Sequence, residues 1–183
     1  MNGTAHQRDG GFTLPELLIV MVIVGILIAI GVPSFKYVTT ANRISSEVNG
    51  LLGDLQYARS QAIKEGLPVT VCSSTDQATC NGGPIWQTGW IVFLDSNGSK
   101  SVDAGETVVR TQAGFSSTDS FIPDNGTFSA VTFNREGYAS TGTAAIVTME
   151  LHNSGNVSQW TRCLAITPVG MLSTQKAGAG NCT

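Results

Sequence analysis

A single carboxylate, Glu16, stands at the front edge of an unbroken apolar run from Leu17 to Val32. A charge in a membrane-grade segment costs roughly 2.5–3.5 kcal/mol on insertion scales, so it is expected to have a partner and a function. Counted from Phe12, the segment has about 21 residues and a helical length of ~31 Å at ~1.5 Å per residue, which matches a hydrocarbon core of ~30 Å. The pattern predicts a membrane-spanning helix with an acidic group at its entrance, and an ordinary single-pass anchor has no need of such a group.

The loop from Asp95 to Glu106 is the second group of residues with a spacing that indicates a definite chemistry. Asp95, Asn97, Asp103 and Glu106 place oxygen ligands at EF-hand-like spacing, with the glutamate in the twelfth place. Against calcium, Lys100 stands where the motif has glycine, and Asp-Ser-Asn-Gly is an ordinary turn composition. The sequence favours a plain turn, keeps weak calcium binding as the alternative, and predicts no other metal site.

Signals for catalysis are scarce. The sequence contains no G-x-S-x-G elbow, phosphate loop or G-x-G-x-x-G fingerprint. His152 is alone within an apparent strand, and the carboxylates Asp103 and Glu106 belong to a loop with no evident cleft. We predict that the protein is not an enzyme and needs no cofactor.

Composition and cysteine content define the setting. The chain has 183 residues with a net charge of −3, so it lacks the bulk basic character that binds nucleic acid nonspecifically. Its 4 cysteines fit two disulfides, which periplasmic chains keep and cytosolic chains rarely do. Four cysteines allow three connectivities. We favour the local pairs Cys72–Cys80, which closes a polar loop, and Cys163–Cys182, which pins a glycine-rich tail to an apolar strand. A zinc site is disfavoured because no paired C-x-x-C spacing occurs.

An amphipathic helix is predicted to continue from the membrane segment to Glu65. Pro33 is expected to bend this helix or loosen its hydrogen bonding, and Gly66, followed by Pro68, is a plausible stop. Apolar residues recur at spacings of three and four and form one stripe. The stripe consists of Ile44, Val48, Leu51, Leu55, Ala58 and Ala62.

Downstream of Gly66 the pattern changes to short strands separated by polar turns. An amphipathic helix laid on antiparallel strands gives an α+β architecture, and the three tryptophans are expected in its core or in a subunit contact. The predicted strands cover residues 69–72, 89–94, 106–111, 128–134, 145–152 and 163–167. The predicted regions are a leader (1–11), a transmembrane helix (12–33), an amphipathic helix (34–66) and a β-rich globular domain (67–183).

The segment from Gly11 to Glu16, Gly-Phe-Thr-Leu-Pro-Glu, together with the apolar run after it, resembles the type III signal of type IV pilins and pseudopilins. In that family a prepilin peptidase cuts after the glycine and methylates the new amino terminus. The resemblance implies cleavage between Gly11 and Phe12 and methylation of Phe12. It also implies that Glu16 pairs with the amine of Phe12 on a neighbouring subunit, an attraction that is strong only where water is excluded.

Three later segments, residues 55–62, 89–95 and 162–166, resemble the FimT/FimU minor pilins and the GspH minor pseudopilins. This implies a type IV pilin-like fold and a minor pilin in a tip or initiation complex that primes pilus assembly for twitching motility and adhesion. The implied location is the bacterial inner membrane with a periplasmic head, then the tip of a pilus or pseudopilus. The implied partners are prepilin peptidase, other minor and major pilins or pseudopilins, the inner-membrane assembly platform and membrane lipid.

Two alternatives stay open. A GspH-type minor pseudopilin of type II secretion would use the same membrane helix and the same attraction of Glu16 for a neighbouring amine, in a short pseudopilus. A FimT-like DNA-binding pilin of natural transformation is associated with a Gly-Arg-x-Arg motif in the tail, but residues 170–173 contain neither arginine, and Arg135 and Arg162 are isolated in the sequence. Because phosphate contacts need several cations together, nucleic acid is not an expected partner.

Overall fold

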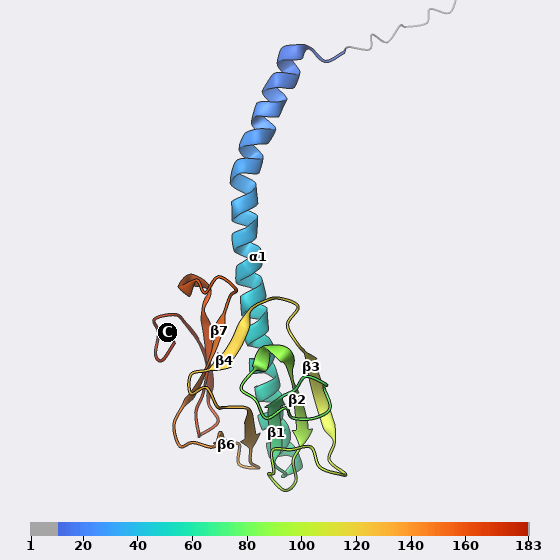
Figure 1. Cartoon of the computed structure of the whole chain (residues 1–183), viewed down its shortest axis with the longest axis vertical. Coiled ribbons are helices and arrows are strands. Elements are labelled where there is room, and N and C mark those ends of the chain that lie inside the picture. Colours follow the sequence, from blue (N-terminus) through green and yellow to red (C-terminus); the bar gives the residue numbers. More distant parts are fainter. Residues whose placement is uncertain (1–10, 183) are drawn as a thin grey trace, which may run out of the picture. The chain divides into compact units, whose positions relative to one another are not determined.

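The computed structural model describes residues 11–182, so most of the predicted leader lies outside the described residues. The chain forms two compact units, with the boundary between Thr40 and Ala41. The first unit contains the N-terminal part of a long helix, and the second is a head made of the rest of that helix and two sheets (Figure 1). The predicted division between residues 33 and 34 concerns the end of the membrane-spanning segment and stays a prediction.

Helix α1 runs from Leu14 to Glu65. It starts two residues after the predicted start at Phe12 and ends at the predicted residue. Pro33 removes one backbone donor, yet the helix is continuous there. Gly66 ends it with a φ of 69°, a left-handed conformation in which its N–H bonds to the carbonyl of Ala62.

The predicted apolar stripe faces the core of the head. Its members, from Ile44 to Ala62, are each at most 2% exposed. They pack in one cluster with residues from both sheets. The spacing of three and four therefore identified the buried face of the helix correctly.

Two antiparallel sheets complete the head (Figure 1). The five-stranded sheet has the order β3-β2-β1-β5-β6, and the four-stranded sheet has the order β4-β7-β8-β9. The α+β prediction is confirmed. The strands are β1 Val69–Ser73, β2 Gly89–Leu94, β3 Val108–Ala113, β4 Ser120–Pro123, β5 Ala130–Phe133, β6 Ala139–Ser140, β7 Val147–His152, β8 Arg162–Ile166 and β9 Leu172–Lys176, with short 3₁₀ turns at Trp86–Thr88 and Ser158–Trp160.

Three strands were not predicted: β4, β6 and β9. Strand β6 has only two residues, and β9 is mostly polar and exposed at the edge of its sheet. Strand β4 is short and contains Pro123. None of them shows an apolar alternation over the length of an ordinary strand, so the sequence pattern does not mark them, although Phe121 and Pro123 of β4 are buried.

The tryptophans lie in the core, as expected. Trp86 stacks on Phe128 with ring centroids 5.4 Å apart, and its indole N–H donates to the carbonyl of Phe128. Trp90 meets Phe115 edge to face. Trp160 is also buried. These rings supply large buried area to the packing of the head.

Candidate functional site

The start of α1 holds Glu16, the acidic residue singled out by the sequence. The backbone N–H of Thr13 donates a long hydrogen bond of 3.5 Å to Oε2 of Glu16. The N–H of Leu17 bonds to the carbonyl of Thr13, which opens the helix. Thr-x-x-Glu is the capping-box pattern, so the spacing of these two residues was a signal for this contact. In the single chain, Glu16 therefore satisfies the start of its own helix.

The rest of the first unit presents apolar side chains outward. By length and composition alone, α1 is the described helix that is long and apolar enough to cross a membrane. Phe12, the predicted mature N-terminus, is 82% exposed. A shallow groove of about 570 Å³ lies on this unit, where Gly31 has no side chain to fill it. Its apolar walls are Val24, Leu27, Ile28, Val32 and Phe35.

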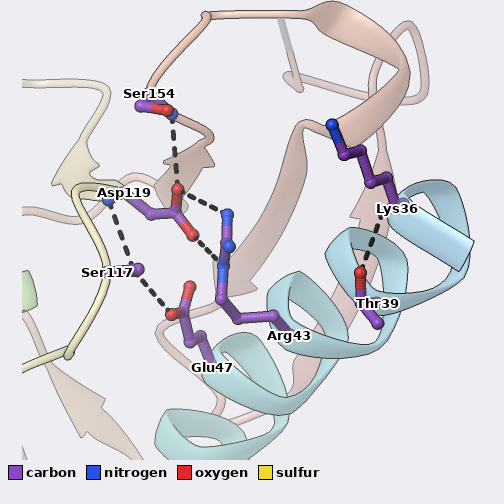
Figure 2. Close-up of polar contacts among 7 residues, drawn as sticks. All are labelled: Lys36, Thr39, Arg43, Glu47, Ser117, Asp119 and Ser154. Atoms are coloured by element: carbon purple, nitrogen blue, oxygen red, sulfur yellow. Dashed lines mark hydrogen bonds and ion pairs between the residues drawn. The ribbon is translucent and has the colours of Figure 1, made fainter. Parts of the chain in front are cut away.

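Within the head, a polar network joins α1 to the loop before β4 (Figure 2). The guanidinium of Arg43 holds Asp119 through two hydrogen bonds of 2.8 and 3.0 Å. The Asp119 side chain is fully buried and also accepts from the N–H of Ser154. Ser117 donates to Oε1 of Glu47 at 2.9 Å and accepts from the N–H of Asp119. These contacts fix the loop against the helix.

Glu47 is the unsatisfied member of this network. Its Oε2 atom is buried and has no hydrogen-bond partner among the described residues. Burial raises the pKa of its carboxyl, and the charge of Asp119 raises it further, against the lowering effects of Ser117 and Arg43. Sequence could not reveal this pair, because residues 47 and 119 lie far apart along the chain.

Further contacts connect the helix to β2, to β3 and to the loop between β5 and β6. Asp54 accepts from the indole N–H of Trp90 and from Arg110, both at 2.9 Å. The Arg110 guanidinium also lies over the ring of Tyr57, 3.8 Å from its centroid. Arg59 donates to the carbonyl of Gly137 at 3.0 Å. The end of α1 at Tyr57 and Arg59 is therefore held against β3 and the loop after β5 within the head.

The structure contains the two local disulfides, Cys72–Cys80 and Cys163–Cys182, each with Cα atoms 5.6 Å apart. Inside the first loop, Asp76 accepts hydrogen bonds from Thr79 and from the N–H of Ala78, which hold the pKa of its carboxyl far below its usual range. The second disulfide joins β8 to the C-terminal tail.

In the candidate calcium loop, the carboxylate oxygens accept hydrogen bonds from nearby groups of the chain. Asp95 is buried and accepts from the hydroxyl of Thr70 and from the N–H groups of Ser99 and Lys100. Lys100 has a φ of 61°, so it adopts the left-handed conformation for which the motif uses glycine.

The remaining oxygens of this loop are engaged in the same way. Asp103 accepts from Asn97 and Ser99, which lower the pKa of its carboxyl. Glu106 accepts from the N–H groups of Ser96 and Asp103. Within residues 11–182, no three His, Cys, Asp or Glu side chains form a metal-holding group. These hydrogen bonds are those expected of a plain turn, and weak calcium binding by the loop stays the alternative prediction.

His152 has one partner on its own strand, Glu150 two residues earlier, and one partner on the neighbouring segment, Thr161. Its ring nitrogens lie 3.2 Å from Oγ1 of Thr161 and 3.2 Å from a carboxylate oxygen of Glu150. A hydroxyl, an imidazole and a carboxylate therefore follow one another beside a polar groove of about 620 Å³. Thr161 is only 1% exposed, so its hydroxyl is not accessible as a nucleophile.

Arg162 is not isolated in the fold, contrary to the expectation from the sequence. It pairs directly with Lys176 across strands β8 and β9. The two cations lie on the same side of the sheet, because directly opposite residues of antiparallel strands project to the same face.

The fold and these contacts define a type IV pilin-like protein: an apolar N-terminal helix with a carboxylate at its start, and a disulfide-bonded α+β head. A family model described as "Type II transport protein GspH" matches residues 47–170. A second model, the prokaryotic N-terminal methylation motif, matches residues 6–32. The chain belongs to the GspH family of pilin-like structural proteins. It is a membrane-anchored component of a pilus or pseudopilus.

Individual relatives agree with this assignment. The chain is 37% identical over 87 residues to the type IV narrow pilus major component PilA5 of Thermus thermophilus, covering 46% of this chain and 71% of that protein. Its fold is similar to the minor pilin FimU of Pseudomonas aeruginosa, with a TM-score of 0.58, 21% identity, and coverage of 73% of this chain and 89% of FimU. A second crystal form of FimU gives a TM-score of 0.55 at the same identity.

Proposed function

We propose that this protein is a minor type IV pilin, a structural subunit of a tip or initiation complex that primes pilus assembly. The observation that carries the proposal is the match of residues 6–32 to the N-terminal methylation motif, followed by a GspH-type head. The fold similarity to FimU supports the minor-pilin form of the proposal. Twitching motility and adhesion would depend on such a subunit through the filament that it initiates.

In the proposed pathway, residues 1–11 direct the chain to the bacterial inner membrane, where residues 12–33 span the bilayer and the head is periplasmic. Prepilin peptidase cleaves after Gly11 and methylates Phe12. Glu16 then exchanges its contact with Thr13 for the amine of Phe12 on a neighbouring subunit. The exposed apolar side chains of the first unit pack against membrane lipid and then against other pilins. The inner-membrane assembly platform brings these subunits together.

Glu16→Ala tests the assembly step. We expect the variant to insert and be cleaved normally but to be absent from sheared filaments, because its carboxylate is the group that attracts the neighbouring amine. Glu65→Ala, which removes an exposed carboxylate at the other end of α1, is the matched control. Immunoblots measure the amount of each variant in sheared filaments relative to its amount in the membrane fraction. Normal incorporation of Glu16→Ala would refute the assigned role.

Processing itself is tested by intact mass and N-terminal sequencing of membrane-extracted protein. The expected chain begins at methylated Phe12 and is lighter by four hydrogens at its cysteines. A chain that still begins at Met1 in cells with active prepilin peptidase would contradict the proposal at its first step.

A GspH-type minor pseudopilin of type II secretion is the second candidate, favoured by the description of the matching family model. Deletion of the gene separates the two. Loss of surface pili with normal secretion supports the pilin, whereas loss of secretion with normal pili supports the pseudopilin.

A further inference from the structure

Arg162 and Lys176 form a like-charge pair across an antiparallel ladder. They are direct partners in the register of β8 and β9. Like charges placed directly opposite each other destabilise a sheet. A strand pair that keeps two cations in this position is expected to have a counter-charge, either within the chain or from another molecule.

The chain does not supply that counter-charge within residues 11–182, where neither Arg162 nor Lys176 forms an ion pair. Nη1 of Arg162 instead donates to the carbonyls of Gln159 and Thr161, at 3.1 and 2.8 Å. These two bonds hold the guanidinium in place, and no carboxylate of residues 11–182 forms an ion pair with it. Lys176 is exposed at the edge strand.

The two cations line a pocket of about 240 Å³ between α1 and the end of this sheet. The other lining residues are neutral and mostly polar, and neither Asp nor Glu is among them. Hydroxyl and amide groups beside a fixed guanidinium and an ammonium are donors for one anionic oxygen group. The neutral lining residues are Ser45, Val48, Asn49, Thr174 and Gln175.

We propose that this pocket binds a carboxylate side chain from the head of a neighbouring filament subunit. The proposal rests on the proposed function, since it requires assembly with other pilin-like subunits. Charge complementarity favours this occupant: the lining residues include two cations and no carboxylate, so the pocket attracts an anionic group presented by a neighbouring head. Nucleic acid fits less well, because two cations on a net-negative chain provide too few phosphate contacts.

Lys176→Glu is the decisive variant. Its new carboxylate would lie opposite Arg162 and form an ion pair within the chain, so the head should be at least as stable as the wild type. The pocket, however, loses the charge that attracts a neighbour. We expect roughly tenfold less of this variant in sheared filaments at an equal membrane level. Lys176→Arg, which keeps the charge, should retain incorporation. Lys64→Glu, the same charge change at an exposed site on α1, is the matched control.

The outcomes separate the two proposals. Incorporation of Lys176→Glu at the wild-type level, with wild type present in filaments, would overturn the pocket assignment alone. Absence of wild type from every filament fraction would overturn the proposed function and the pocket with it. A gel shift of duplex DNA by the full chain that Lys176→Glu abolishes would assign the pocket to phosphate and also overturn this inference. No shift, together with selective loss of Lys176→Glu from filaments, supports it.

Discussion

Replacing Glu47 by Gln tests whether the head carries an avoidable negative charge beside Asp119. One carboxylate oxygen of Glu47 accepts from Ser117, whereas the other is buried without a partner among the described residues. Glutamine has the same shape and keeps an acceptor for Ser117. It also presents an amide N–H₂ towards a buried, ion-paired carboxylate. We therefore expect Glu47→Gln to stabilise the head at neutral pH.

The size of the effect follows from the burial of this side chain. A buried polar group without a partner costs about 1–3 kcal/mol. Glu47 is only half-buried, so we place the gain at the lower end, about 1 kcal/mol. For 150–250 residues, a change of this size raises the unfolding midpoint by about 2–4 °C.

The gain should depend on pH, and its sign follows from the raised pKa of Glu47. A raised pKa means that the folded chain holds the proton more tightly than the unfolded chain. The penalty is absent below the ordinary glutamate pKa of about 4.3 and is complete above the raised folded-state pKa. As pH falls from neutral towards about 4, the wild type becomes more stable relative to Glu47→Gln, and the difference between them closes.

Tryptophan fluorescence of the full chain in lipid nanodiscs provides the assay, because all three tryptophans are buried in the head. Glu65→Gln, an exposed change on the same helix, is the control and should not move the midpoint measurably. An unchanged or lowered midpoint for Glu47→Gln at pH 7 would refute the reasoning. So would a gain of equal size at pH 4 and pH 7.

Three further predictions concern the head. Replacing Cys163 and Cys182 together by Ala should lower the free energy of unfolding by about 3 kcal/mol in denaturant titrations; an unchanged midpoint would contradict it. Gly170→Ala should cost at least ~2 kcal/mol, since φ is +77° and the new Cβ would overlap the carbonyl oxygen of Gly137; a melt equal to wild type would argue against this clash. Calorimetry with millimolar calcium should give no heat from loop 95–106, and a saturable heat would restore the calcium interpretation.

The helix and its buried face were predictable because both depend on local spacing. The apolar run from Leu17 to Val32 predicts the first part of the helix, and the stripe at spacings of three and four predicts the face of the helix that packs in the head. Gly66 ends the helix where its left-handed conformation is needed. These features require no knowledge of distant residues, so sequence alone was sufficient.

The polar contacts of the head were not predictable in the same way. Arg43 meets Asp119, Asp54 meets Arg110 and Arg59 meets Gly137 only because the sheets fold against the helix. Single residues of this kind show no periodicity. The pairing of Arg162 with Lys176 depends on β9, a polar edge strand that lacks an apolar pattern.

Local sequence patterns describe what the protein shares with its family, whereas contacts between distant residues distinguish it from other members. In the proposed function, the segment from Gly11 to Glu16 and the apolar helix would provide the processing and axial attraction that any pilin-like subunit can use, and their residues lie in one continuous stretch. Partner choice must come from the head, where charges from distant segments are brought together. Variants of Glu16 should therefore remove the chain from every filament, whereas Lys176→Glu should affect only those assemblies whose neighbouring subunit supplies the opposing carboxylate.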